Sequence, residues 1–284
     1  MKLQHILAGA DESEAGRRAV RSAIDLARRA DARVTVVHAV PVMAMAVAAT
    51  TTGGYDFAGA EIQSPAIEEL RQWIGSDLRA RSEPPPVELA IVSGIPGMEI
   101  RRLADQREAD LVVLGRKRRS QFARLILGDT AGLVARHSQI PCLIVPANSG
   151  SLGRMLVAID DSNNGMLVLA KAASFAQATG ITLKVLTVEP GSDDRATPGE
   201  SAGKSRARQV REILSHHGME AALPAVEMRR GAIVPEILAA LGASGSDLLA
   251  IGYHRRGLPG VIEAGSTGRR LVHTAPCAVL TIPL

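Results

Sequence analysis

Two stretches of the chain combine glycines, arginines and the start of a helix in an order that suits anion binding. Residues 110–130 read as an apolar strand, a glycine, a basic loop and a second glycine ahead of a helix. Residues 247–267 repeat that order at the same spacing. Backbone N–H groups converge in such a loop and the helix dipole adds partial positive charge, so phosphate is the expected ligand class. The glycines are Gly115 and Gly128 in the first copy and Gly252 and Gly265 in the second.

The repeat extends over the whole chain and indicates a tandem duplication. Near the N-terminus stands ILAGADES, which matches MLVAIDDS after the midpoint. We expect two domains, residues 1–147 and residues 152–284, separated by the turn-rich Pro146–Arg154. The first half carries one extra segment, Val42–Ser64, rich in small residues. We interpret this segment as a loop that serves as a lid or partner contact, or as a disordered insertion.

Short apolar strands alternate with longer helical patterns in each half. Val34–Val40 is apolar almost throughout, as expected of a strand that is covered on both faces. This rhythm predicts an α/β fold of two tandem doubly wound domains, each a five-stranded parallel sheet flanked by helices. The elements expected in the first half are His5–Ala10, Glu14–Arg29, Val34–Val40, Ala66–Leu78, Val87–Val92, Met98–Arg107, Leu111–Leu114, Asp129–Arg136 and Cys142–Val145.

In a doubly wound sheet, ligands bind outside the carboxyl ends of the strands, where the strand order reverses. Asp11 and Asp160 follow the first strand of each half, and Ala39 and Val188 end the second strand. We expect these residues near the sugar or base of a nucleotide and the glycine loops near its phosphates. Each aspartate either caps the helix that follows it or contacts the ligand.

Both halves resemble universal stress protein domains, and the resemblance covers essentially the whole chain. It is carried by Asp-x-Ser after the first strand (Asp11–Ser13 and Asp160–Ser162) and by loops similar to the pattern Gly-x2-Gly-x9-Gly-Ser/Thr. Two further runs resemble the family near the fifth strands, HSQIPCLIV and APCAVLTI. The resemblance implies an adenine-nucleotide hydrolase-like fold, usually paired with another. In members with the full glycine pattern it implies bound ATP or ADP, with Mg²⁺ accompanying the nucleotide.

The glycine pattern is incomplete in both halves. Arg118 and Arg255 occupy the position of the middle glycine. An arginine there either crowds the close approach of a polyphosphate to the backbone or supplies a bidentate phosphate contact.

The end of the pattern also differs between the halves. Gly265-Ser266-Thr267 fits the family, whereas Gly128 is followed by Asp129. A carboxylate beside phosphates is unfavourable by about 1–4 kcal/mol, so we favour the second half as the nucleotide site. The candidate binding residues are Asp160, Val188, Gly252, Arg255, Gly265, Ser266 and Thr267 in the second half and Asp11, Ala39, Gly115, Arg118, Gly128 and Thr130 in the first.

The resemblance favours a stress-response regulator that binds adenine nucleotide without significant turnover and acts on protein partners that the sequence does not identify. Two alternatives stay open: an interaction scaffold whose phosphate loops are degenerate, and a weak ATPase that uses Asp160. We assign no catalytic residue and no metal site. The halves are expected to form an intramolecular pseudo-dimer through their apolar fifth strands, Cys142–Val145 and Cys277–Ile282, because those edges would otherwise be exposed. A homodimer of the whole chain also stays open.

Composition excludes other classes of function. The chain has 284 residues and a net charge of +4, with a basic run at Arg116–Arg119. Aromatic residues make up only 2%, too few to stack on bases, which argues against nucleic acid as a partner. No run approaches the roughly 20 apolar residues of a membrane span. The opening MKLQHILAGAD is too short in apolar length for a secretory signal, so we expect a cytoplasmic location.

Three remaining features are interpreted as structural. Cys142 and Cys277 lie in apolar runs and are expected to be buried and reduced. The neighbours His216 and His217 point two ways around a helix, which is poor geometry for a shared metal. Residues 190–206 contain a sequence similar to a Walker A loop, but the spacing is one residue short and no strand precedes it. We expect that segment to be an ordinary loop.

Overall fold

The computed structural model of the chain describes residues 2–40, 65–116, 129–190, 200–217, 226–253 and 266–284. The strands are β1 (His5–Gly9), β2 (Arg33–Val40), β3 (Val87–Ser93), β4 (Leu111–Arg116), β5 (Cys142–Pro146), β6 (Arg154–Ile159), β7 (Thr182–Pro190), β8 (Glu227–Gly231), β9 (Leu248–Tyr253) and β10 (Ala278–Pro283). The helices are α1 (Glu14–Ala30), α3 (Pro65–Arg79), α4 (Pro96–Gln106), α5 (Asp129–His137), α6 (Asn163–Thr179), α7 (Glu200–His216), α8 (Ile233–Ser244) and α9 (Ser266–Thr274).

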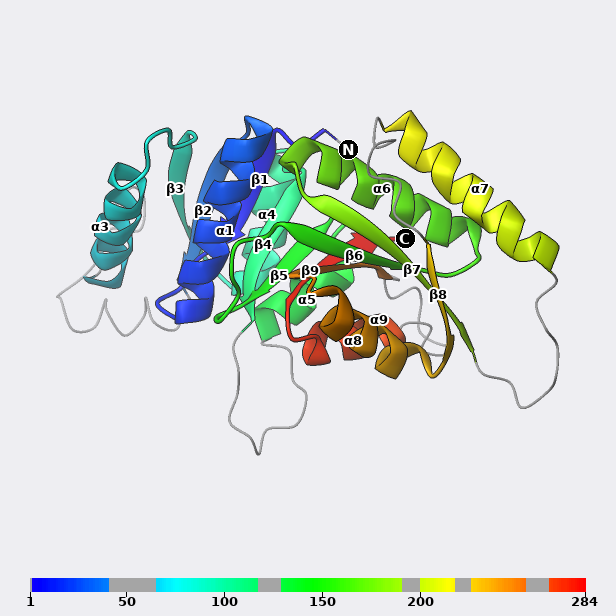
Figure 1. The fold of residues 1–284 in the computed structure, drawn as a ribbon. Coiled ribbons are helices and arrows are strands. Elements are labelled where there is room, and N and C mark those ends of the chain that lie inside the picture. The colour runs from blue at the N-terminus through cyan, green and yellow to red at the C-terminus, as the bar shows by residue number, and fades with distance from the viewer. Residues whose placement is uncertain (1, 41–64, 117–128, 191–199, 218–225, 254–265) are drawn as a thin grey trace.

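Within these residues, ten strands form one sheet in the order β3-β2-β1-β4-β5-β10-β9-β6-β7-β8 (Figure 1). All strand pairs inside each half are parallel. The strand order reverses between β1 and β4 in the first half and between β6 and β9 in the second. The predicted fold of two tandem doubly wound α/β units is therefore confirmed, and each unit has one point where the strand order reverses, which is where ligands bind in folds of this kind.

The two halves meet through their fifth strands, as the sequence predicts. β5 and β10 pair antiparallel, with Leu143 directly opposite Leu280. These two leucines are equivalent, because each lies two residues before the partner of the loop glycine, Val145 opposite Gly115 and Ile282 opposite Gly252. A pair of equivalent residues at the centre of an antiparallel ladder places an approximate two-fold axis there. The halves are thus arranged as a pseudo-dimer with a continuous sheet.

Two apolar layers cover the two faces of this sheet. Ile6 points into the layer under α1, α3, α6 and α7, whereas its neighbour Leu7 points into the layer under α4, α5, α8 and α9. Figure 1 shows α1, α6 and α7 on one side of the sheet and α5, α8 and α9 on the other. The alternation follows from strand geometry, in which successive side chains point to opposite faces. Both layers continue across the β5–β10 junction, so the halves share one core.

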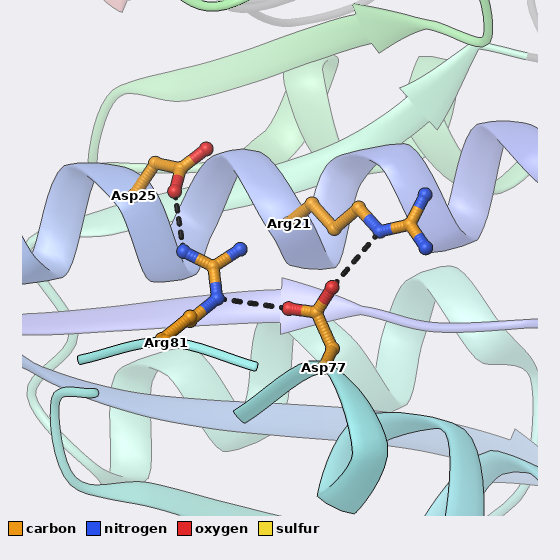
Figure 2. A network of polar contacts seen from close by, with 4 residues as sticks. All are labelled: Arg21, Asp25, Asp77 and Arg81. Carbon is orange, nitrogen blue, oxygen red and sulfur yellow. Dashed lines mark hydrogen bonds and ion pairs between the residues drawn. The ribbon is translucent and has the colours of Figure 1, made fainter. Parts of the chain in front are cut away.

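A network of charges fastens α3 onto α1 (Figure 2). Arg21 and Arg81 both bind the Asp77 carboxylate, at 3.1 and 3.0 Å, and Arg81 also binds Asp25 at 2.5 Å. The guanidinium of Arg21 also lies 5.4 Å from the centre of the Trp73 ring, within reach of a cation–π interaction. These contacts hold α3 against α1.

One predicted loop is wrong in part. The start of α7 at Glu200 shows that residues 200–206 are helical, although the sequence analysis assigned them to a loop. The segment is rich in Glu, Ala, Lys and Arg, which are good helix formers, and Val210 and Leu214 further along the same helix are buried in the core. Gly203-Lys204-Ser205 therefore lies inside a helix, which fits the rejection of a phosphate loop there. Val42–Ser64 lies outside the described residues.

The predicted burial of both cysteines is confirmed. Cys142 and Cys277 are buried free thiols. Burial raises the pKa of Cys142 to about 12 and that of Cys277 to about 11. No helix within the described ranges is long and apolar enough to cross a membrane.

Candidate functional site

The turn after the first strand of each half positions an aspartate at the crevice. In the second half, Oδ1 of Asp160 accepts hydrogen bonds from the backbone N–H and the hydroxyl of Ser162, at 3.0 and 2.5 Å. The Ser162 hydroxyl oxygen in turn accepts from the N–H of Gly165 at 3.1 Å, which caps α6. Asp11 and Ser13 form the same turn ahead of α1. The serine is therefore the capping residue, and the aspartate orients it.

A glycine in the first turn of each of these helices makes the arrangement possible. A Cβ atom on Gly165 would lie 2.3 Å from the carbonyl oxygen of Asp160 and 2.7 Å from its Oδ1. A Cβ on Gly16 would lie 2.4 Å from Oδ1 of Asp11. Sequence reasoning missed this requirement, although the signal is present as Asp-x-Ser-x-x-Gly in both halves.

A large pocket opens at the carboxyl ends of β6, β7 and β9, with a volume of about 1010 Å³. Four of the candidate residues line it together: Asp160, Val188, Gly252 and Thr267. Its apolar wall includes side chains of β9 and α8, among them Ile237 and Ile251. Ser266 is the first residue of α9, whereas Arg255 and Gly265 lie outside the described residues. The second half thus brings together an acid, an apolar wall and a helix start, as a nucleotide site requires.

The other wall of this pocket is basic. It is formed by Arg136 and His137 of α5 together with Arg269, Arg270 and His273 of α9. Asp160 is the one acidic side chain among the described lining residues. The pKa of His273 is lowered by burial and by nearby arginines, which shows that positive charges converge here. Sequence reasoning missed this wall, and the available signal was the Arg-Arg pair that follows Thr267.

The pocket beside Asp11 in the first half is much smaller, with a volume of about 10 Å³. It lies between α1 and α3 and is lined in part by His38 and Trp73. A volume of roughly 10–15 Å³ holds a single water molecule, so this pocket has no room for a nucleotide. Ala39 is the penultimate residue of β2, and Thr130 lies in the first turn of α5. Arg118 and Gly128 lie outside the described residues.

The two loop glycines that the structure describes have different surroundings. A Cβ on Gly115 would lie 2.4 Å from the carbonyl carbon and 2.5 Å from the carbonyl oxygen of Ala15, so this glycine lets α1 pack against β4. A Cβ on Gly252 would instead meet the ends of the Val168 and Leu284 side chains, at 2.9 and 2.8 Å. The glycine of the first half is therefore required by helix packing, whether or not a ligand binds.

Arg116, the first residue of the basic run at Arg116–Arg119, contacts the other half of the chain. Its guanidinium donates hydrogen bonds to the carbonyl oxygens of Val272 at 2.5 Å and Ala275 at 2.7 Å. These carbonyls lie at the C-terminal end of α9, where a cation also complements the helix dipole. The first residue of the basic run thus joins the two halves, and the remaining three lie outside the described residues.

The described residues contain no group of three or more His, Cys, Asp or Glu side chains that could hold a metal ion. His216 and His217 contact each other edge to face, with ring centres 5.3 Å apart.

Comparison with known proteins finds the same family in both halves of the chain. A model of the universal stress protein family matches residues 2–146 and residues 152–283. A universal stress protein of Synechocystis is 29% identical over 147 residues, which cover 49% of this chain and 96% of the relative. A universal stress protein of Mycobacterium tuberculosis is 25% identical over 235 residues, which cover 78% of this chain and 76% of the relative.

The fold of the whole chain also has a counterpart of known structure. The crystal structure of a universal stress protein from Archaeoglobus fulgidus superposes with a TM-score of 0.71, covering 100% of this chain and 99% of the other at 18% identity. That likeness extends over both halves and their junction. Because the family model accounts for nearly the full length of each half, the chain belongs to the universal stress protein family.

Proposed function

We propose that this protein is a stress-response regulator that binds ATP or ADP in the pocket of its second half without significant turnover. The observation that carries the proposal is the pocket of about 1010 Å³ at the switch point of the second half, lined on one side by Arg136, Arg269 and Arg270. Arg136, Arg269 and Arg270 form no ion pair with any carboxylate in the described part of the chain. An anionic ligand would neutralise this excess charge.

The lining residues suit the parts of a nucleotide. Val188 and Ile251 offer an apolar surface for the base, and the Asp160 carboxylate lies at the same strand edge. Gly252 lies near the end of β9 and Thr267 at the start of α9, and the start of a helix favours negative charge. We assign the start of the phosphate chain to that end of the pocket.

The family includes a member whose crystal structure was solved in complex with cAMP, so nucleotide binding lies within the range of the family. The proposal for this chain is supported by its own pocket.

The residues of the pocket fit a magnesium ion only as a companion of the nucleotide. Asp160 is the one acidic side chain among the described lining residues, and its Oδ1 already accepts hydrogen bonds from Ser162. Mg²⁺ prefers oxygen ligands and often keeps several waters while binding substrate phosphates. We therefore assign its ligands to the phosphates and water, with Asp160 as the nearest protein carboxylate.

The absence of turnover is part of the proposal, and Asp160 is the residue that tests it. Its Oδ1 is committed to the turn that caps α6, which gives the residue a structural task independent of chemistry. Bound nucleotide would stabilise one arrangement of the crevice and so change the surface offered to protein partners. The alternatives are an interaction scaffold with degenerate loops and a weak ATPase that uses Asp160.

Calorimetric titration of the purified chain with ATP and Mg²⁺, together with a phosphate-release assay, separates the three functions. The regulator binds one nucleotide per chain and releases no phosphate over many turnovers. Asp160→Asn keeps an oxygen acceptor for Ser162 while removing the charge, and Asp11→Asn is the matched variant in the first half. Sustained hydrolysis that is lost in Asp160→Asn would establish the ATPase. Failure of the native chain to bind any adenine nucleotide would favour the scaffold.

A further inference from the structure

The pocket of the second half is not built by the second half alone. Arg136 and His137 belong to α5 of the first half, yet both line the same cavity as Asp160 and Val188. The antiparallel pairing of β5 with β10 brings the two halves together at this point. The site is therefore composite, with a contribution from each half.

The pocket follows α9 along most of its length. Thr267, Leu271 and Thr274 all line it, and their spacing of three to four residues places them on one side of the helix. Seven residues of α-helix rise by about 10 Å, so the pocket extends about that far from the start of α9 toward its end. Arg136 and His273, which lies in the last turn of α9, line this pocket together, and the charge of Arg136 contributes to the lowered pKa of His273.

The chemistry of Arg136 suits the end of a phosphate chain. Its planar guanidinium stays charged at all working pH values and can bind phosphate through two parallel hydrogen bonds. No carboxylate in the described ranges forms an ion pair with it. α5 and α9 each have nine residues, so the equivalent of Arg136 in the second half is His273. The pKa of His273 is lowered, mainly by burial, so the equivalent position does not offer the same permanent charge.

We infer that the ligand of this pocket is a nucleoside polyphosphate that bridges the two halves, with its terminal phosphate held by Arg136 of the first half. The inference rests on the proposed function for the adenine end of the ligand. Arg136 is then the residue that distinguishes a triphosphate from a monophosphate, because only a long phosphate chain reaches it. Binding would also tie the two halves together through the ligand.

Calorimetric titration of native protein, Arg136→Gln and Arg136→Lys with ATP, AMP and inorganic tripolyphosphate tests the inference. Arg28→Gln is the matched control, since Arg28 also lies in the last turn of a helix but outside the pocket. We expect Arg136→Gln to lower the affinity for ATP and for tripolyphosphate about tenfold, because one charged phosphate contact is lost. The affinity for AMP should fall less than twofold. Arg136→Lys should retain part of the affinity, and Arg28→Gln all of it. Melting curves show whether each variant is folded.

The outcomes separate this inference from the proposed function. Suppose that ATP binds, but Arg136→Gln lowers the affinities for ATP and AMP equally or changes neither affinity. The bridging contact is then wrong, while nucleotide binding stands. If adenine nucleotides do not bind but tripolyphosphate binds in a manner that depends on Arg136, the composite phosphate site stands and the adenine assignment is wrong. If no probe binds to the native protein, both are overturned.

Discussion

Substituting alanine for Gly165 should destabilise the protein, whereas the same substitution at Gly242 should stabilise it. Both glycines lie in helices, Gly165 in the first turn of α6 and Gly242 near the end of α8. Around Gly242 there is no atom within 4 Å of an added Cβ. At Gly165 the added Cβ would lie 2.3 Å from the carbonyl oxygen of Asp160, a backbone atom that cannot swing aside.

The expected changes in the free energy of unfolding have opposite signs at these two positions. Alanine is favoured over glycine in a helix interior by about 1 kcal/mol, and Gly242→Ala should gain most of that. Overpacking costs typically 1–3 kcal/mol, and at Gly165 the clash falls on the turn that holds Asp160 and Ser162. We therefore expect the free energies of unfolding of the two variants to differ by about 2–4 kcal/mol.

Urea unfolding followed by circular dichroism measures this difference. Gly16→Ala serves as a second test of the clash, because its Cβ would lie 2.4 Å from Oδ1 of Asp11. Nucleotide titration of Gly165→Ala adds a functional measurement, since displacement of Asp160 should also lower the affinity for the nucleotide. If Gly165→Ala and Gly242→Ala proved equally stable, the tight turn would not be a constraint and the structural role assigned to the Asp-x-Ser-x-x-Gly pattern would be wrong.

Three further predictions concern the junction and the buried titratable groups. Arg116→Met removes both hydrogen bonds to the end of α9 and should lower the free energy of unfolding in urea by about 2–3 kcal/mol. The control Arg28→Met should leave the free energy of unfolding unchanged. Equal effects of the two substitutions would refute the role of Arg116 in joining the halves. Burial lowers the pKa of His5 below its value of about 6.5 in the unfolded chain, so the unfolded chain takes up a proton first and stability should fall as the pH drops below 6.5. His5→Gln should show a shallower decline between pH 7.5 and 5.5, and an unchanged slope would contradict this. Because burial raises the pKa values of Cys142 and Cys277, neither thiol should react with a disulfide reagent at pH 8 until urea unfolds the protein.

Much of the fold could be predicted from the sequence because both halves show the same pattern of strands, turns and helices. The apolar strands, the Asp-x-Ser turns and the loop glycines recur at matching spacing, and a parallel doubly wound sheet follows from their order. The pairing of the fifth strands was predictable because two apolar edges would otherwise be exposed. The start of α7 could not be predicted, because the sequence of residues 200–206 contains no large apolar residue.

The composite pocket required the structure. Arg136 and Thr267 are far apart in the sequence, and they line one cavity only because the β5–β10 ladder fixes how the halves meet. The same holds for Arg116, whose hydrogen-bond acceptors lie more than 150 residues away. The Asp-x-Ser-x-x-Gly spacing marks Gly165, but the 2.3 Å that would separate an added Cβ from the carbonyl oxygen of Asp160 could be measured only in the structure.

The most direct test of the central claim compares obstruction of the two crevices. Val188 lines the large pocket, and Ala39 is its equivalent at the end of β2. Titration of Val188→Trp and Ala39→Trp with ATP and Mg²⁺, with melting curves as a check of folding, shows which half holds the nucleotide. We predict that Val188→Trp abolishes binding while Ala39→Trp binds one nucleotide like the native chain. Native binding in a folded Val188→Trp variant would contradict the account.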